Sequence, residues 1–154
     1  MGIEIERKFL VISNTWKALA TRSYLKQGYI SSEPGRIARV RIEGESATLT
    51  IKGLSVGITC GEWNYPIPLD DAQALLDTVC QQPLIEKYRY RLPMDGLTWE
   101  IDEFLGANAG LVVAEIELPS EHYVFTYPDW LGADVSHDRR YANANLLKHP
   151  FNEW

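Results

Sequence analysis

Apolar and polar residues alternate along most of the chain, with a dominant period of two. In the segment 38–42, for example, Ala38, Val40 and Ile42 alternate with two arginines. Successive side chains of a β-strand point to opposite faces, so this pattern predicts strands with one apolar and one polar face. About eight strands are expected, of which 24–30 has the weakest pattern. They cover residues 3–6, 24–30, 37–42, 47–52, 62–67, 85–92, 98–104 and 112–118.

Turn signals and a few helical stretches separate these strands. The tetrapeptide EGES at 43–46 and the pair Asp95-Gly96 each join two strands and are typical of hairpins. A helix is expected over Leu69–Cys80, capped by Asp70 or Asp71, with shorter helices over 14–19 and 138–147. Many antiparallel strands with few helices predict an α+β protein, mostly antiparallel β, folded as a barrel or a sandwich.

Composition and charge narrow the range of partners. The chain is 45% hydrophobic and 23% charged and has no linker or repeat, which indicates a single globular domain over residues 1–154. The net charge of −6 disfavours binding to nucleic acid, because that affinity depends on Lys and Arg that neutralise phosphates. No apolar run approaches the roughly 18 residues of a membrane span. We therefore expect no nucleic-acid and no membrane partner, and a homodimer remains possible.

The cysteines and the first residues favour a cytoplasmic location. Cys60 and Cys80 lack the spacing of a zinc site and do not form a disulfide framework. Charge appears from the fourth residue, which is not the pattern of a signal peptide. A reduced, cytoplasmic setting is the expectation that follows.

Charged residues share one face of nearly every expected strand, and their signs are segregated strand by strand. On a solvated surface, like charges clustered in this way repel one another. In a wet interior, acidic strands would hold divalent cations and basic strands would hold a polyanion. The pattern alone leaves a solvated outer face and an inward-facing tunnel equally open. The sets are Glu4, Glu6 and Lys8; Arg39 and Arg41; Lys87, Arg89 and Arg91; Glu100 and Asp102; and Glu115 and Glu117.

The same residues lie in segments that resemble the motifs of a known family. The sequence EIERKFLV at 4–11 is similar to the ExExK signature of the CYTH superfamily, the triphosphate tunnel metalloenzymes. The segments RVR at 39–41, LTIKG at 49–53, WEIDEF at 99–104, GLVVAEIEL at 110–118 and DRRYAN at 138–143 resemble further motifs of that family. The similarity runs in order over essentially the whole chain.

The resemblance implies a closed eight-stranded antiparallel β-tunnel with a few flanking helices. It further implies one or two Mg²⁺ or Mn²⁺ ions bound in the tunnel together with a triphosphate, which hydrolysis would convert to phosphate and pyrophosphate. The metal ligands would be Glu4, Glu6, Glu62, Glu115 and Glu117, with Asp102 as a further candidate site residue. The phosphate-binding residues would be Lys8, Arg39, Arg41, Lys52, Lys87 and Arg89.

Two residues have candidate catalytic roles. Lys8 would serve as a general base or as a clamp on a phosphate oxygen. Tyr29 would either assist Lys8 or simply pack as an aromatic residue, and these readings stay equally open. Trp99 and Trp130 are expected in the core rather than as substrate platforms.

One strand departs from the family pattern. Cys60 stands where the family often has an Arg, and Asn64 stands where it often has a second Glu. Alternatives to an inorganic triphosphatase therefore remain. They are an adenylate cyclase, a nucleoside or thiamine triphosphatase, and a non-catalytic protein that binds polyphosphate or organic phosphates.

Overall fold

The computed structural model describes residues 2–154, in which nine strands form one antiparallel sheet. Every predicted strand is present, and most are longer than the alternation alone indicated. The strands are β1 (Ile3–Val11), β2 (Thr21–Ser31), β3 (Ile37–Glu43), β4 (Ser46–Val56), β5 (Thr59–Pro66), β6 (Ile85–Met94), β7 (Leu97–Phe104), β8 (Val112–Glu117) and β9 (Leu131–Asp134).

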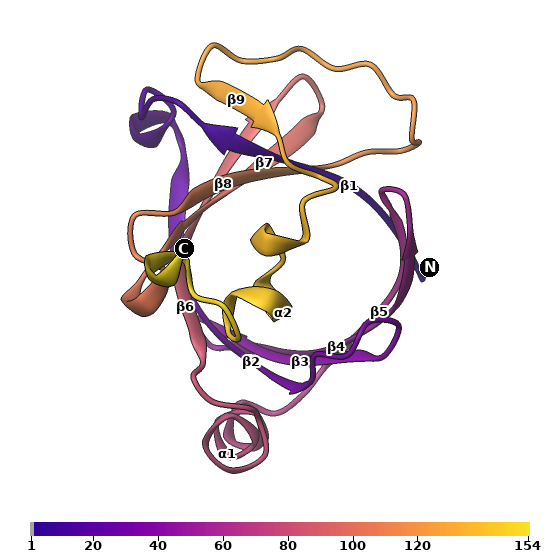
Figure 1. Ribbon diagram of the computed structural model, residues 1–154, viewed down its shortest axis with the longest axis vertical. Helices are drawn as coiled ribbons and strands as arrows, with labels where there is room; N and C mark the ends of the chain where they lie inside the picture. Colours follow the sequence, from indigo (N-terminus) through magenta and orange to yellow (C-terminus); the bar gives the residue numbers. More distant parts are fainter. Residues whose placement is uncertain (1) are drawn as a thin grey trace.

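Strand β1 closes the sheet into a barrel. Its central residues pair with β8, while Ile3–Ile5 pair with β5 at the far edge of the sheet, so eight strands form a ring (Figure 1). The prediction of a closed eight-stranded β-tunnel is confirmed. Strand β9 was not predicted, because its four residues LGAD show no alternation; it pairs with β1 beyond the point where β5 leaves it.

The helices flank the barrel or cover one of its ends. Helix α1 (Leu69–Thr78) packs on the outside through Ala72 and Leu76. Its N-cap is Pro68, so the predicted cap at Asp70 or Asp71 is wrong; both carboxylates instead lie in the first turn, where the helix dipole favours them. The predicted helix over 14–19 is reduced to a 3₁₀ turn at Lys17–Leu19.

The C-terminal segment is not the continuous helix predicted over 138–147. It consists of a 3₁₀ turn at Arg139–Tyr141 and the short helix α2 (Asn143–Leu146), with a further 3₁₀ turn at Phe151–Glu153. Ala142 between the first two is extended (φ −68°, ψ 132°), which interrupts the helix. This segment lies across the opening of the ring (Figure 1). Among residues 2–154, no helix has the length and apolar character needed to cross a bilayer.

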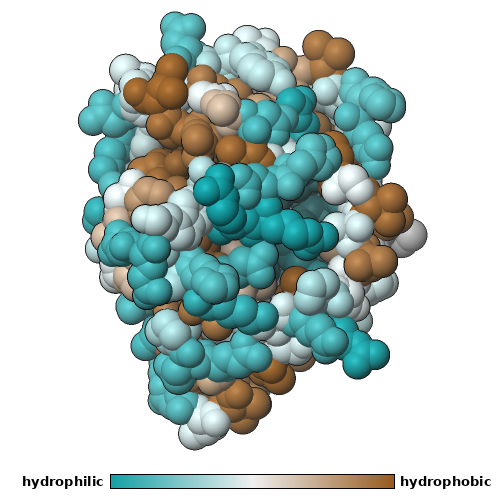
Figure 2. All heavy atoms as spheres, in the orientation of Figure 1, coloured by the Kyte–Doolittle hydropathy of each residue, from teal (hydrophilic) through white to brown (hydrophobic). Residues whose placement is uncertain are grey.

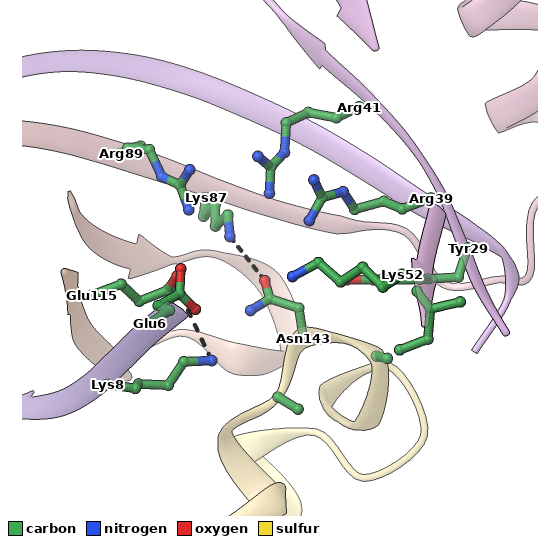
Figure 3. A pocket seen from close by; sticks show the side chains of 13 residues that line it. Glu6, Lys8, Tyr29, Arg39, Arg41, Lys52, Lys87, Arg89, Glu115 and Asn143 are labelled. Atoms are coloured by element: carbon green, nitrogen blue, oxygen red, sulfur yellow. Dashed lines mark hydrogen bonds and ion pairs between the residues drawn. The ribbon is translucent and has the colours of Figure 1, made fainter. Parts of the chain in front are cut away.

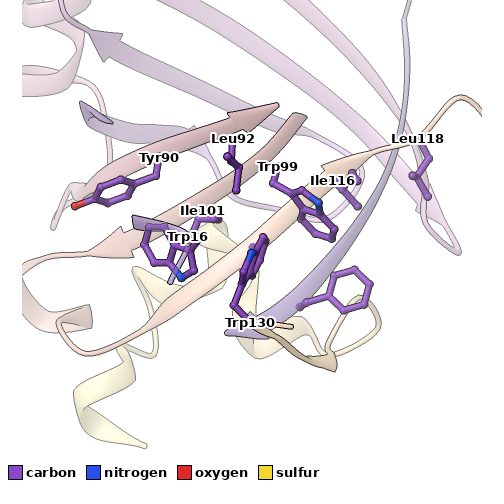
Figure 4. Packing of buried hydrophobic residues seen from close by; sticks show 10 residues of the cluster. Trp16, Tyr90, Leu92, Trp99, Ile101, Ile116, Leu118 and Trp130 are labelled. Carbon is purple, nitrogen blue, oxygen red and sulfur yellow. The ribbon is translucent and has the colours of Figure 1, made fainter. Parts of the chain in front are cut away.

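Most of the apolar core lies outside the barrel wall. Trp99 and Ile116 project outward from β7 and β8, and Trp16 and Trp130 pack over them from flanking segments (Figure 4). Phe9 of β1 belongs to the same cluster. The prediction that Trp99 and Trp130 belong to the core is confirmed, since each is at most 5% exposed. Because the outward faces are covered in this way, the charged faces of the same strands point into the lumen.

Candidate active site

The strand register pairs opposite charges across the lumen wall. Lys8 on β1 lies opposite Glu115 on β8, and Lys52 on β4 lies opposite Glu62 on β5. Arg89 on β6 lies opposite Asp102 on β7. The tunnel reading of the charge pattern is therefore correct, and the outer-face reading is wrong for these residues.

A cavity of about 110 Å³ lies in the lumen, and we call it the lumen cavity. Acidic side chains approach it from β1 and β8, and basic side chains approach it from β3, β4 and β6 (Figure 3). Nine of the thirteen predicted site residues line it: Glu6, Lys8, Tyr29, Arg39, Arg41, Lys52, Lys87, Arg89 and Glu115. The other four, Glu4, Glu62, Glu117 and Asp102, lie on the same faces of their strands but outside the lining of this cavity. From outside, hydrophilic residues surround a hollow near the middle of one face (Figure 2).

Glu6 and Glu115 form a carboxyl pair at the acidic side of the cavity. Burial raises the pKa of Glu6 well above its usual range, and the neighbouring Glu115 and Glu4 raise it further. Burial opposes ionisation of Glu115 too, but Lys8 and a hydrogen bond from Glu6 hold the pKa of Glu115 well below its usual range. The two carboxyls therefore share one proton, as like charges in close contact require.

Glu4 and Glu62 form a second carboxyl pair around Lys52. The Lys52 Nζ lies 3.2 Å from a carboxylate oxygen of each. Burial, opposed by Lys52 and assisted by Glu62, raises the pKa of Glu4 to about 7. The pKa of Glu62 is lowered despite burial, because Lys52 and Asn64 stabilise its charged form.

The carboxyl pairs fit a hard divalent cation. Each pair retains a proton that a cation can displace, and carboxylate oxygens are the ligands that Mg²⁺ and Mn²⁺ prefer. Among residues 2–154, no three His, Cys, Asp or Glu side chains are close enough to hold a metal ion by themselves. Mg²⁺ commonly binds through one or two carboxylates plus phosphate oxygens and water, so this arrangement fits a metal that arrives with a phosphate.

Asp102 anchors the basic side of the lumen. Its carboxylate lies 2.7 Å from Lys87 Nζ and accepts two hydrogen bonds from Arg89 (2.8 and 2.9 Å). Burial alone would raise the pKa of Asp102, but Arg89 and Lys87 lower it to about 2. Burial lowers the pKa of Lys87 to about 7, because Asp102 compensates only in part. Asp102 thus holds two cations at the cavity wall rather than facing a ligand itself.

Arg39 and Arg41 complete the basic side and are less fully engaged. Arg41 Nε donates to Gln27 Oε1 at 2.8 Å, and Arg39 Nη2 donates to Thr50 Oγ1 at 3.1 Å. Burial, together with repulsion from Arg39 and Arg89, lowers the pKa of Arg41 to about 9. The Arg39 Nε is buried and has no hydrogen-bond partner within the part of the chain that the structure describes. A buried donor without a partner is costly, so this atom indicates a position for an anionic ligand.

Lys8 and Tyr29 line the same cavity without contacting each other by a hydrogen bond. The Lys8 Nζ donates to the Tyr141 carbonyl oxygen at 3.1 Å and lies 3.6 Å from Glu115. The Tyr29 hydroxyl instead accepts from Gln27 Nε2 at 3.3 Å, and its ring belongs to an apolar cluster that includes Tyr141.

Two residues outside the predicted set also contribute to the site. The Asn143 Oδ1 accepts from Lys87 Nζ at 2.8 Å and from Gln27 Nε2 at 3.2 Å. Asn143 ends the DRRYAN segment, and Gln27 shares a strand face with Tyr29, so both signals were present in the sequence. Neither side chain carries a charge, and only the C-terminal segment's position over the barrel brings Asn143 to Lys87.

The strand that departs from the family pattern is well connected. Asn64 accepts from Thr50 Oγ1 at 2.6 Å and donates to Glu62 Oε1 at 2.9 Å. The Cys60 Sγ donates to backbone carbonyls, at 3.2 and 3.4 Å, and has no charged partner. Asn64 therefore orients Glu62 through this hydrogen bond, whereas a glutamate at position 64 would repel the Glu62 carboxylate.

Comparison with known proteins gives a consistent result. The family model of the CYTH domain matches residues 2–147. An inorganic triphosphatase from Acetivibrio thermocellus is 48% identical over 151 residues, covering 98% of this chain and 97% of the relative. An inorganic triphosphatase from Nitrosomonas europaea is 36% identical over 149 residues, covering 93% and 95%. The crystal structure of the inorganic triphosphatase NE1496 aligns with a TM-score of 0.67 at 30% identity, covering 94% and 93%.

Proposed function

The chain belongs to the CYTH domain family, and we propose that it is a metal-dependent hydrolase that cleaves inorganic triphosphate to phosphate and pyrophosphate inside its barrel. Two relatives at 48% and 36% identity are inorganic triphosphatases, which supports this substrate. The observation that carries the proposal is the lumen cavity itself, where carboxyl pairs face a cluster of cations that includes the unpartnered Arg39 Nε.

The cations would bind and orient the triphosphate. Phosphoryl transfer depends mostly on positioning and on stabilising charge on the phosphate oxygens. Arg39 and Arg41 offer guanidinium groups suited to bidentate phosphate contacts, while Lys87 and Arg89 are held in place by Asp102. Lys8 and Lys52 would contact the phosphates from the acidic side, where their present partners are carboxylates.

The carboxyl pairs would hold Mg²⁺ or Mn²⁺. The candidate ligands are Glu4, Glu6, Glu62, Glu115 and Glu117. When bound, the metal supplies neutralisation of phosphate oxygens and lowers the pKa of a water molecule. Glu115, the member of its pair with the depressed pKa, would remain charged throughout and so be ready to bind the metal. Lys8 would act as a clamp on a phosphate oxygen or as the base, and Tyr29 would position the Gln27 amide.

We further propose that residues 2–154 act as one domain in the cytoplasm, without a nucleic-acid or membrane partner. The unpaired thiols Cys60 and Cys80 support a reducing compartment.

An end-product assay tests the function. The purified protein is incubated with inorganic triphosphate, ATP or thiamine triphosphate in Mg²⁺, Mn²⁺ or EDTA. Phosphate, pyrophosphate and cyclic AMP are then measured. We expect metal-dependent release of phosphate and pyrophosphate from inorganic triphosphate. Cyclic AMP from ATP would identify a cyclase, faster turnover of an organic triphosphate would change the substrate, and binding without turnover would identify a phosphate-binding protein.

A further inference from the structure

A second cavity adjoins the lumen cavity at the end of the barrel beside Lys8. It measures about 290 Å³ and lies between the β4–β5 turn (Ser55, Gly57) and the segment 135–142. We call it the mouth cavity. Lys8 and Ala142 line both cavities, so an anion in the mouth cavity would be one side chain away from the lumen. An open outer hollow over residues 134–139 shares Val135, His137, Asp138 and Arg139 with the lining of the mouth cavity.

Arg139 gives the mouth cavity an uncommitted positive charge. Its side chain is exposed and lines both the mouth cavity and the outer hollow. Within residues 2–154, its guanidinium makes no ion pair and no hydrogen bond to another side chain. The adjacent Arg140 differs, since it binds Asp138 at 2.7 Å and stacks over Trp154 at 4.9 Å. Arg140 is therefore engaged by an ion pair and an aromatic ring, whereas the charge of Arg139 is available to a ligand in the mouth cavity.

The carboxylates near the mouth are already neutralised by other cations. Asp138 is paired with Arg140, and Asp134 lies 2.6 Å from Arg7. The charge left over is that of Arg139, with His137 beside it, while Lys8 lies between the two cavities with its Nζ 3.6 Å from Glu115. The mouth cavity is therefore locally positive, although the whole chain has a net charge of −6.

The opposite end of the barrel also has arginines in its cavity wall, Arg39 and Arg41, but these donate to Thr50 and Gln27 deeper in the lumen, and the rim outside them carries a paired charge. There the rim charges are Glu43 and Arg91, which form a bidentate pair, and Arg91 also contacts Glu100 at 3.4 Å. Hydroxyl groups of Ser46 and Thr48 make up much of the remaining wall. A polyanion approaching an acidic protein is drawn to local positive potential, which distinguishes the two ends.

We propose that the mouth cavity is an anion-binding entry site, at which Arg139 and Lys8 capture inorganic triphosphate before it passes into the lumen. This inference rests on the proposed function, because it assigns the route of the same substrate. The ligand class is a small inorganic polyphosphate, recognised by charge and by the Ser55 hydroxyl rather than by any organic group.

A pair of matched substitutions tests the entry site. Arg139→Gln and Arg22→Gln each remove one exposed arginine charge, but only Arg139 lines the mouth cavity, whereas Arg22 on β2 lies over the Tyr88 ring. At low ionic strength we expect Arg139→Gln to lower kcat/KM for triphosphate about 3- to 10-fold while kcat stays within about twofold. The loss should nearly vanish in about 0.5 M salt, where screening is strong. Arg139→Lys should restore the wild-type value, and Arg22→Gln should leave it unchanged.

A binding measurement separates failure of the entry site from failure of the proposed function. Calorimetric titration with inorganic triphosphate in EDTA should show weaker binding to Arg139→Gln than to Arg22→Gln, whether or not hydrolysis occurs. Equal effects of the two substitutions, or a fall in kcat alone, would overturn the entry site. Wild-type binding in EDTA without phosphate release when Mg²⁺ or Mn²⁺ is supplied would overturn the hydrolase instead, and absence of binding in EDTA together with absence of release in either metal would overturn both proposals.

Discussion

At the scale of single residues, the lumen is a set of charges that satisfy one another incompletely. The pKa of Glu6 is raised beside Glu115 and that of Glu4 beside Glu62, while the Arg39 Nε has no partner among residues 2–154. Buried charges of this kind are costly unless they are paired or bind ions. The residues are therefore arranged for a ligand that brings both positive and negative charge, as a metal-bound triphosphate does.

Glu6→Gln and Lys8→Ala should each reduce turnover of triphosphate by about 100-fold or more, because each removes a charge at the reacting phosphates. The fold should persist, since Glu6→Gln replaces a carboxyl that is already protonated in the metal-free protein. Steady-state kinetics and thermal unfolding check both points. Glu45→Gln and Lys26→Ala, at positions outside the lumen cavity, serve as matched controls, and wild-type rates in both lumen variants would contradict the site assignment.

The raised pKa of Glu4 makes the stability of the metal-free protein depend on pH. Its folded pKa is about 7, against 4.5 as the usual value. The folded state therefore binds more protons than the unfolded state between these values, and stability falls as pH rises through about 7. Urea unfolding in EDTA at pH 5, 6 and 7 should show a loss on the order of 1–3 kcal/mol.

Two controls accompany the pH series. Glu4→Gln should make the decline shallower, because the amide does not titrate, while Glu6 with its raised pKa still contributes. Mg²⁺ should restore stability at pH 7, since a cation then replaces the proton. A pH-independent stability in EDTA would show that Glu4 is not buried as a carboxylic acid.

At the scale of elements, strand register brings each charge to its partner, and helix packing fixes the wall from outside. Helix α1 reaches the barrel next to Gly28 of β2, where Leu76, Cys80 and Leu84 crowd the backbone. A side chain at this position would have no room, so the glycine is required for close approach rather than for an unusual φ. The strand face opposite Gly28 carries Gln27 and Tyr29 into the lumen.

Gly28→Ala should destabilise the protein by about 1–3 kcal/mol, because overpacking displaces the neighbouring side chains. An added Cβ would lie 2.7 Å from Leu84 Cδ2 and 2.9 Å from Cys80 Cβ. Gly53→Ala is the control, since its Cβ would meet nothing nearer than 3.8 Å, and it should change stability by less than about 0.5 kcal/mol. Equal losses in urea unfolding would contradict the packing argument.

At the scale of the whole molecule, closure of the sheet by β1 converts charged strand faces into an enclosed site. The acidic strands β1 and β8 lie next to each other, and the basic strands β3 and β6 are separated from each other only by β2. The ring therefore places one acidic and one basic wall around the same lumen. A ligand must satisfy both walls to gain the full benefit of the enclosed, weakly screened environment.

Metal and polyphosphate should accordingly stabilise the protein together more than the sum of their separate effects. A non-hydrolysable imido analogue of triphosphate, present at about 100 times its Kd, should by itself raise the free energy of unfolding by about 2.7 kcal/mol. Mg²⁺ added together with the analogue should raise it by more than the two separate gains combined. Thermal unfolding with each component and with both checks this. Strictly additive shifts in Tm would indicate that the two walls act independently.

The sequence predicted the fold well because period-two alternation depends on local backbone geometry. It also indicated which face of each strand carries charge, and so it grouped Glu6 with Lys8 and Arg39 with Arg41. The helix over 138–147 was wrong because a local pattern does not register that Asn143 is held by Lys87 and Gln27. Strand β9 was missed because so short an element exists only through pairing with β1.

What the sequence by itself determined is therefore the set of strands and the identity of the charged faces, since both follow from the spacing of side chains along one strand. What only the tertiary structure decided is the direction of those faces. The outward positions of Trp99 and Phe9 are buried by distant segments, which leaves the charges no face but the lumen. The mouth cavity beside Arg139 likewise exists only because residues far apart in the chain meet at one end of a closed barrel.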